Sequence, residues 1–375
     1  MKQVYFYRSY LLEGDSRSQK MIEDYRKRDY SVCTVVWTRG REMKPSSDSI
    51  AFNGSGLLGG RAGNALFFLR WHWFIAKTIF ARRKTDTLIH CVDFDTAIVC
   101  VPLAKIFRKK VIFDGFDHFA SSRDFAGMGF RIFHKLEKLL CRAADVCILP
   151  DEARRQQYEL PSKNAAGDNV RIIGNIPTAA PASTSKVDDV VVPGNADHNI
   201  LTLCYVGTLE AVHRGLEYIP DLCRKLEGRV RFVVAGIGEL DEFFKNQSEK
   251  LPNLEYLGAV PYDRALQIMS RSDVLYGPYL LSSANHRFAS PNKMYEHMML
   301  GKCLITNKGT PVADFVEQNG TGLLFDGSLA DLERVVISIE KRESQSKGTV
   351  ARQRWEQEYQ WLRERQVQSY FEELV

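Results

Sequence analysis

One stretch late in the chain combines charged residues with the signals of a helix start. Ser290 and Pro291 precede Lys293, Glu296 follows within one turn, and Gly301 comes just before a short apolar run. Proline suits a first helical turn and glycine a helix end, so we predict a helix that leads into a strand. The N–H groups at a helix N-terminus, with Lys293 beside them, attract phosphate. Glu296 can accept hydrogen bonds from the two hydroxyls of a ribose. The pattern therefore predicts a nucleotide-sugar site, and the alternative is an ordinary capped helix.

Composition limits the classes to which the chain can belong. Its 375 residues suit two domains, and 45% hydrophobic with 26% charged residues is typical of a globular protein. The eight cysteines are scattered without a Cys-x-x-Cys pair, so we expect reduced core thiols. A net charge of +5 is too small to indicate nucleic-acid binding. No apolar stretch suits a signal peptide or a membrane span, so we expect a cytoplasmic protein.

A basic and aromatic segment covers residues 70–84. It interleaves Trp71, Trp73 and Phe80 with lysine and arginine. Such a helix can lie on an anionic membrane surface, and we predict peripheral membrane contact here. The alternative is a core-packed helix with a charged end.

Strand and helix patterns alternate along the chain, which favours an α/β fold with doubly wound parallel sheets. The alternation stops in residues 179–198, which we interpret as a linker or exposed loop, and then restarts. We therefore divide the chain into a first domain, 1–178, and a second domain, 199–343. A charged tail, 344–375, has a helical repeat and needs a surface on which to pack.

Several short motifs occur in a fixed order in the second half. They are Tyr205 to Leu209, His213 to Gly215, Val234 to Gly238, Tyr256 to Pro261 and Ser290 to Glu296. Together they resemble the second domain of GT-B retaining glycosyltransferases of family 4, also called group 1. Softer similarities in the first half are at 15–17, 37–39, 90–93, 114–118 and 136–138.

The resemblance implies two Rossmann-like domains facing a cleft, with the C-terminal helix packing back on the first domain. The first domain would bind an acceptor and the second a nucleotide-sugar donor, with UDP expected rather than GDP. Neither a metal nor a cofactor beyond this co-substrate is implied.

The resemblance also implies roles for individual residues. Arg214 and Lys293 would hold the diphosphate, where negative charge develops on the leaving group, and Glu296 would bind the ribose. Gly236 and Gly238 would shape the turn near the nucleotide. The expected donor-binding set is Gly207, Thr208, Arg214, Gly236, Gly238, Val260, Ser290, Pro291, Asn292, Lys293 and Glu296.

Two positions depart from the family pattern. Phe288 occupies the place of a first glutamate, eight residues before Glu296, and Phe116 occupies the place of a histidine in the first domain. His118 follows two places late, with Asp117 as the fallback. The expected catalytic set is therefore His118, Asp117, Arg214 and Lys293.

Two further groups lie in the first half. Ser16, Arg17 and Lys20 follow the first strand, and we predict that they bind an acceptor phosphate. Asp93 and Asp95 match the Asp-x-Asp metal motif of another glycosyltransferase architecture. Because they follow a strand in a doubly wound domain, we expect a loop or helix cap instead of a metal site.

The sequence thus predicts a retaining, metal-independent glycosyltransferase that acts on a glycan or lipid-linked acceptor in surface polysaccharide biosynthesis. A nucleotide-sugar epimerase of the same fold is one alternative. A catalytically silent GT-B-like scaffold subunit is another, which Phe288 and Phe116 would permit.

Overall fold

The chain forms two compact units, Met1–Gly174 with Gln366–Val375, and Asn175–Arg365. The computed structural model describes residues 2–13, 15–41, 43, 46–54, 61–123, 125–163, 165, 168–177 and 200–374, apart from the side chains of residues 61–65. The predicted linker, residues 179–198, lies outside the described residues. So does most of the glycine-rich segment at 54–60.

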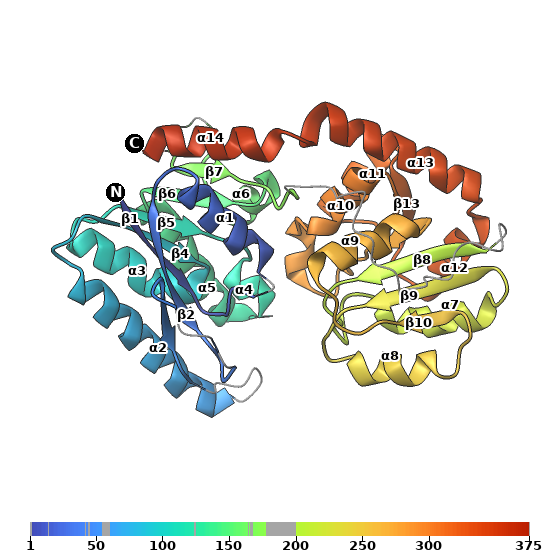
Figure 1. The fold of residues 1–375 in the computed structure, drawn as a ribbon, viewed down its shortest axis with the longest axis horizontal. Coiled ribbons are helices and arrows are strands. Elements are labelled where there is room, and N and C mark those ends of the chain that lie inside the picture. The colour runs from blue at the N-terminus through green and yellow to red at the C-terminus, as the bar shows by residue number, and fades with distance from the viewer. Residues whose placement is uncertain are drawn as a thin grey trace. The chain divides into compact units, whose positions relative to one another are not determined.

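The first unit is built on a seven-stranded parallel sheet in the order β3-β2-β1-β4-β5-β6-β7 (Figure 1). Val4 of the central strand pairs with Val32 on one side and Leu88 on the other. The central strands are buried on both faces, as expected when helices cover a parallel sheet. The strands are β1 (Gln3–Arg8), β2 (Ser31–Trp37), β3 (Ser49–Phe52), β4 (Thr87–Val92), β5 (Val111–Asp114), β6 (Val146–Leu149) and β7 (Val170–Ile172).

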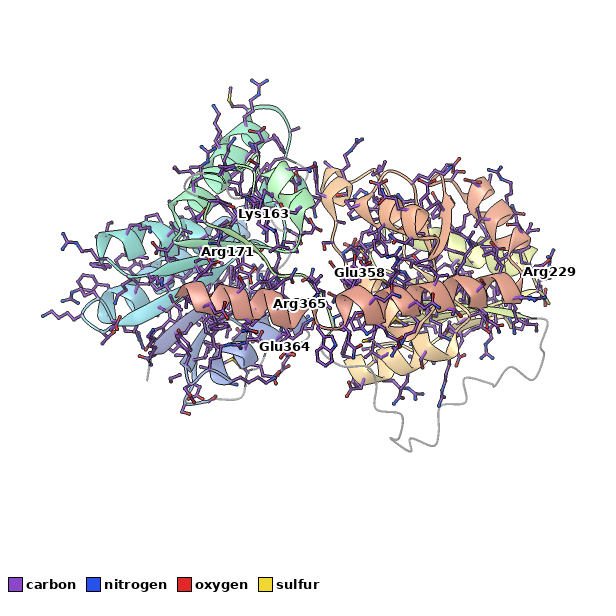
Figure 2. All side chains as sticks on the ribbon, turned by 90° about the horizontal axis from the view of Figure 1, so that it is seen from above. Lys163, Arg171, Arg229, Glu358, Glu364 and Arg365 are labelled. Carbon is purple, nitrogen blue, oxygen red and sulfur yellow. The ribbon has the colours of Figure 1, made fainter. Side chains whose placement is uncertain are left out.

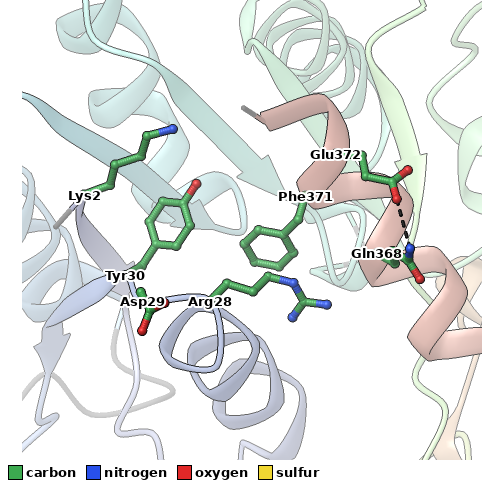
Figure 3. A pocket seen from close by; sticks show the side chains of 7 residues that line it. All are labelled: Lys2, Arg28, Asp29, Tyr30, Gln368, Phe371 and Glu372. Atoms are coloured by element: carbon green, nitrogen blue, oxygen red, sulfur yellow. Dashed lines mark hydrogen bonds between the residues drawn. The ribbon is translucent and has the colours of Figure 1, made fainter.

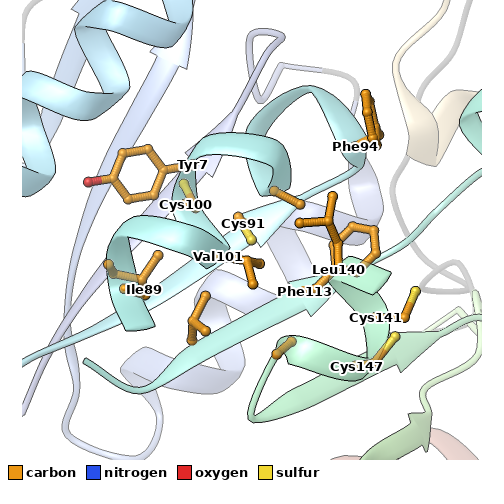
Figure 4. Close-up of a cluster of buried hydrophobic side chains, with 14 of the residues drawn as sticks. Tyr7, Ile89, Cys91, Phe94, Cys100, Val101, Phe113, Leu140, Cys141 and Cys147 are labelled. Atoms are coloured by element: carbon orange, nitrogen blue, oxygen red, sulfur yellow. The ribbon is translucent and has the colours of Figure 1, made fainter. Parts of the chain in front are cut away.

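Helices cover both faces of this sheet. One face packs against α2 (Arg61–Ala81), α3 (Phe94–Ile106) and α5 (Gly127–Ala143), whose buried side chains join one core cluster. Figure 4 shows Phe113, Cys100 and Leu140 within it. The other face packs against α1 (Ser16–Arg26) and the C-terminal helix. Short helices α4 (Phe119–Ser122) and α6 (Glu152–Gln157) complete the unit.

The C-terminal tail is not one helix. It consists of α13 (Lys341–Arg354), a π-helical turn η3 (Trp355–Tyr359) and α14 (Leu362–Leu374). Figure 2 shows Glu358 on η3 and Arg365 on α14. From Gln366 onward the chain belongs to the first unit, where Tyr370 packs against Tyr25.

The second unit has a six-stranded parallel sheet in the order β10-β9-β8-β11-β12-β13. Its strands are β8 (Leu201–Val206), β9 (Val230–Ala235), β10 (Leu254–Tyr256), β11 (Val274–Tyr276), β12 (Cys303–Asn307) and β13 (Gly322–Phe325). One face is covered by η1 (Leu216–Tyr218), α7 (Ile219–Lys225), α8 (Asp241–Ser248) and α12 (Leu329–Ser338). The other is covered by α9 (Tyr262–Arg271), α10 (Asn292–Leu300), α11 (Pro311–Asn319) and α13.

The predicted helix and strand after Ser290 are present. They are α10 and β12, and Gly301 ends the helix in the left-handed conformation with φ 64°. Both sheets are parallel with helices on both faces, which confirms the predicted fold class. The eight cysteines are free thiols, seven of them buried. None of the helices among the described residues combines the length and the apolar character needed to cross a bilayer.

Candidate functional site

The candidate site lies at the carboxyl edge of the second sheet. The strand order reverses direction between β8 and β11, and ligands of doubly wound sheets bind at such a switch point. Three segments meet there, namely the loops after β8 and β9 and the N-terminus of α10. Each contributes residues that the sequence had predicted.

Two glycines allow the loops after β8 and β9 to touch. A Cβ added to Gly236 would lie 1.8 Å from the carbonyl oxygen of Gly207, and one on Gly238 would lie 2.4 Å from that of Leu209. Both approaches are shorter than any side chain allows, and Gly236 also has φ 144°. Leu209 and Gly238 pair as a β-bridge. As predicted, these glycines shape the backbone, while Gly207 and the exposed Thr208 lie at the end of β8.

The N-terminus of α10 is suited to an anion. Its N-cap is Pro291, and among the described residues no side chain caps it. In its first turn the Met294 N–H donates to the Pro291 carbonyl at 3.2 Å. The N–H groups of Asn292 and Lys293, at the very start of the helix, are left to a ligand or to water. The Ser290 hydroxyl is buried and lacks a hydrogen-bond partner in the described part of the chain. The Asn175 amide donates to the Ser290 carbonyl at 2.8 Å, which fixes the peptide before the helix.

Lys293 reaches from α10 to the end of β8. Its Nζ donates a hydrogen bond to the Val206 carbonyl and lies 4.4 Å from the centroid of the Tyr205 ring. Burial lowers the pKa of Lys293, while nearby Glu296 raises it and Arg214 lowers it further. The positive charges of Lys293 and Arg214 therefore lie close enough to repel each other. A bound diphosphate would relieve their repulsion.

Arg214 is held from two sides. Its Nε and Nη2 donate to the Glu210 carboxylate at 3.0 and 3.2 Å, and its guanidinium lies 4.3 Å from the Tyr279 ring centroid. Burial, then Arg214, lowers the pKa of neighbouring His286 to about 4, so this imidazole is neutral near pH 7. Glu210 and the Tyr279 ring thus fix the orientation of the Arg214 guanidinium, and neutral His286 lies beside it.

Glu296 lies one turn into α10 and is buried. Burial, and next the Glu296 carboxylate, raise the pKa of Tyr262 at the start of α9. Val260, half-buried, comes just before this tyrosine. The structure therefore brings Glu296 to the same edge as Lys293, with Tyr262 as a neighbour that the sequence did not indicate.

Sequence reasoning missed Glu210 and Tyr279, and it gave Tyr205 no role of its own. Tyr279 is anchored by Asn307, whose side chain accepts from its N–H at 2.5 Å and donates to its carbonyl at 2.9 Å. Glu210 lies four residues before Arg214, but this segment is not helical, so the spacing alone gave no signal. The aromatic residues carried no local signal, since only the fold places their rings beside the cations.

In the first unit, His118 is fully buried. It caps α4, where its Nδ1 accepts from the Ser121 N–H at 3.2 Å, and its Nε2 lies 3.0 Å from His134 Nδ1. Burial lowers the pKa of His118 to about 3. This placement favours a structural role for His118. Asp117 has an exposed carboxylate, 2.7 Å from an Arg154 nitrogen, and its catalytic role stays a prediction.

Arg17 also points into the first unit. Its Nη2 lies 2.8 Å from Asp114, and its Nη1 donates to the Ile173 carbonyl at 2.7 Å. Phe116 lies between two guanidinium groups, 4.7 Å from Arg8 and 4.8 Å from Arg17. The predicted acceptor contact of Arg17 is therefore disfavoured.

The other two residues of that group lie on the first turns of α1. Ser16 and Lys20 are half-buried there. Their predicted role in acceptor binding stays a prediction.

The carboxylates of Asp93 and Asp95 are engaged within the protein. Asp93 accepts the Phe116 N–H at 2.9 Å and pairs with Arg8, and burial raises its pKa to about 6. Asp95 accepts the Ser9 hydroxyl at 2.8 Å. Asp93 is the N-cap residue of α3 without a side-chain capping bond, and it adopts φ 61°.

A cavity of about 580 Å³ lies elsewhere in the first unit (Figure 3). It opens at the amino ends of the strands, between Lys2, the end of α1 and α14. Its charged residues have both signs, Lys2 and Arg28 with Asp29 and Glu372. This mixture and its place at the opposite edge of the sheet from the strand carboxyl ends argue against a nucleotide site.

Comparisons with known proteins give a family match over part of the chain and a set of similar folds. Residues 193–358 match the family described as "Glycosyl transferases group 1". A search of curated proteins found no match.

Several solved structures share the fold over the whole chain. Anabaena HepE, solved with UDP and glucose, is 15% identical with a TM-score of 0.71, covering 100% of this chain and 99% of its own. Sucrose-phosphate synthase from Thermosynechococcus elongatus is 12% identical with a TM-score of 0.73, covering 100% and 98%. The lipopolysaccharide outer core galactosyltransferase WaaB, in its apo form, is 12% identical with a TM-score of 0.60, covering 100% of both chains. These likenesses confirm the GT-B fold.

Proposed function

We propose that this protein is a glycosyltransferase that moves a sugar from a nucleotide-diphosphate sugar to a glycan or lipid-linked acceptor. One observation carries the proposal: Lys293, Arg214 and the uncapped N-terminus of α10 converge at the carboxyl edge of the second sheet. The match of residues 193–358 to group 1 glycosyltransferases supports it.

The chemistry follows from where charge develops. When the sugar leaves, negative charge grows on the distal phosphate of the nucleoside diphosphate. Two oriented cations and backbone N–H groups stabilise that charge without reorganisation, because Tyr205, Glu210 and Tyr279 already hold the cations in place. These protein groups can neutralise the diphosphate, so the proposed reaction needs no metal.

We expect UDP as the carrier of the sugar. The Anabaena HepE structure, solved with UDP and glucose, supports this choice by analogy of fold. Glu296 would accept hydrogen bonds from the ribose hydroxyls. Because its carboxylate is buried, the local dielectric constant is low, which strengthens such bonds. Surface polysaccharide assembly is the pathway that we propose, with a hexose as the transferred sugar.

The proposed transfer retains the configuration of the sugar. The departing phosphate can itself take the acceptor proton, so the mechanism requires no strong base. This suits a chain in which Phe288 replaces an expected glutamate and His118 is buried.

A catalytically silent scaffold subunit is the second candidate, and Phe288 and the buried His118 favour it.

One experiment distinguishes a transferase from an epimerase and from a scaffold. The protein is incubated with UDP-glucose, UDP-galactose, UDP-N-acetylglucosamine and GDP-mannose, with and without a lipid-linked glycan acceptor and with and without EDTA. Nucleotide binding, released nucleotide, glycosylated acceptor and free sugar are measured. Release of UDP with a sugar of retained anomeric configuration supports the proposal. A changed free sugar would indicate an epimerase, and binding without turnover would indicate the scaffold.

A further inference from the structure

We infer that the outer surface of α2, α3 and α5 docks on an anionic lipid bilayer. These three helices form one layer over the first sheet, because their inner side chains share a single core cluster (Figure 1). Their outer sides therefore face the same direction. We call this outer surface the α2/α3/α5 face.

Apolar side chains are exposed along each helix of this face. On α2 they recur at a helical spacing, and Trp73 is 65% exposed although its neighbour Trp71 is fully buried. Exposed apolar residues at this many positions on three neighbouring helices are unusual for a monomeric protein without a partner. The exposed apolar residues are Leu66, Leu69, Trp73 and Phe80 on α2, Ile106 on α3, and Met128, Ile132, Leu136 and Leu139 on α5.

The exposed charges on the three helices themselves have one sign, and the loop after α2 adds two cations and the exposed Asp86. The three helices contain only two acidic residues, Asp95 and Glu137, and both are buried. The exposed cations are Arg70 and Lys77 on α2, Arg83 and Lys84 just after it, and Arg131, Lys135 and Arg142 on α5. Lys105 and Lys138 are left out of this set, because they pair with Asp145 and Glu159.

Cations and rings are paired on this surface. Lys77 Nζ lies 5.5 Å from the Trp73 ring centroid, and the Arg83 guanidinium lies 4.1 Å from that of Phe80. Such pairs suit a headgroup boundary, where the ring can enter the acyl region while the adjacent cation meets lipid phosphate. Phe80 also contacts Phe107 edge to face, which joins the ends of α2 and α3.

A lipid surface fits better than an acidic protein. The exposed apolar residues are spread over three helices, whereas a protein partner would be expected to fill a pocket at a few anchor residues. A bilayer needs only a row of apolar side chains among cations. Binding of this face to a bilayer does not depend on the proposed transfer reaction.

The test measures vesicle binding of the full chain. Sedimentation with phosphatidylcholine vesicles, with and without phosphatidylglycerol, should show binding only to the anionic vesicles, and added salt should weaken it. Trp73→Gln should reduce partitioning roughly tenfold. The matched control is Trp361→Gln, which removes a tryptophan 55% exposed in the other unit.

Charge is tested in the same way. The double variant Lys77→Glu with Lys135→Glu should abolish binding to anionic vesicles. Lys245→Glu with Lys250→Glu, which makes the same change on exposed residues of the second unit, should leave it intact.

A spectroscopic readout locates the contact. Of the five tryptophans, Trp37, Trp71 and Trp355 are buried, so in the Trp361→Gln protein Trp73 alone is exposed. Brominated lipids should quench its fluorescence. Absence of vesicle binding, equal binding to neutral vesicles, or binding without quenching of Trp73 would each overturn the inference.

Discussion

The ammonium group of Lys293 lies 4.4 Å from the centroid of the Tyr205 ring, at the point where α10 meets the end of β8. The ring face and the Val206 carbonyl both attract the cation, which offsets part of the cost of its burial. Lys293 is thus oriented before any ligand arrives. An oriented cation is what a leaving diphosphate requires, so this contact links the fold to the proposed chemistry.

Replacement of Lys293 by Met should separate catalysis from stability. Methionine has similar volume and lacks the charge, so the buried site should tolerate it and the melting temperature should change little. The turnover number should fall by about 10² to 10³, the effect of removing one charge-stabilising donor. Steady-state kinetics with whichever of the four nucleotide sugars proves to be the donor measures this change in turnover number. Unchanged turnover would show that Lys293 only packs against Tyr205.

Gly236 and Gly228 form a matched pair for the glycine turn. Both have positive φ, but nothing lies within 4 Å of a Cβ on Gly228, whereas one on Gly236 would overlap the Gly207 carbonyl. Gly228→Ala should therefore cost about 1 kcal/mol of backbone strain. Gly236→Ala should add overpacking of about 1–3 kcal/mol and displace the loop after β8. Urea unfolding of both variants measures the difference, and equal costs would contradict the close approach.

His297 should make the stability of the second unit depend on pH. The residue is buried, with Nδ1 at 3.3 Å from the Lys293 carbonyl, and burial lowers its pKa to about 4. Between about pH 6.5 and 4 the unfolded chain then binds a proton that the folded chain does not. The free energy of unfolding should fall as pH drops through this window, by about 3 kcal/mol for this group.

The matching variant is His297→Gln, which does not titrate. Denaturant unfolding at several pH values should show a flatter acid limb than in the wild type. An unchanged slope between pH 6.5 and 4 would mean that His297 is not the group responsible.

The C-terminal helix should stabilise the first unit through Tyr370. The Tyr370 hydroxyl lies 2.6 Å from the Tyr25 hydroxyl. The Tyr25 hydroxyl also lies 3.1 Å from His90 Nδ1. Tyr370→Phe should cost about 1 kcal/mol, the value of one buried hydrogen bond. Tyr370→Ala should cost about 3–5 kcal/mol, because it also leaves a cavity against Phe371. Thermal unfolding compares the stability of the two variants. A similar loss of stability in both would show that packing of the Tyr370 ring contributes little.

Local patterns allowed part of the structure to be predicted from the sequence. The helix from Asn292 and its stop at Gly301 follow from proline, spacing and glycine, which act within a few residues. The turn role of Gly236 was implied by the resemblance to the family motif, and the structure adds its cause, a Cβ that would overlap the Gly207 carbonyl. The parallel sheets follow from the alternation of strands and helices.

Other features depend on partners far away in the chain. Arg17 was predicted to meet an acceptor, yet its guanidinium is bound by Asp114 and Ile173, which no local signal reveals. His118 was judged from its position after a strand, whereas its burial against His134 depends on how α5 packs. The sequence gave no sign that Tyr279 belongs to the site, because only the fold places its ring beside Arg214.

In the proposed donor site, Glu296 binds the ribose of a nucleoside diphosphate. Isothermal titration calorimetry with UDP and 2′-deoxy-UDP on wild type and Glu296→Gln tests it as a double-mutant cycle. Glu242→Gln, an exposed residue of α8, is the control. Loss of a charged hydrogen bond should weaken UDP binding about tenfold to a hundredfold, with a much smaller loss for the deoxy nucleotide. Equal losses for both nucleotides, or no binding of UDP by the wild type, would show that Glu296 does not bind the ribose of UDP.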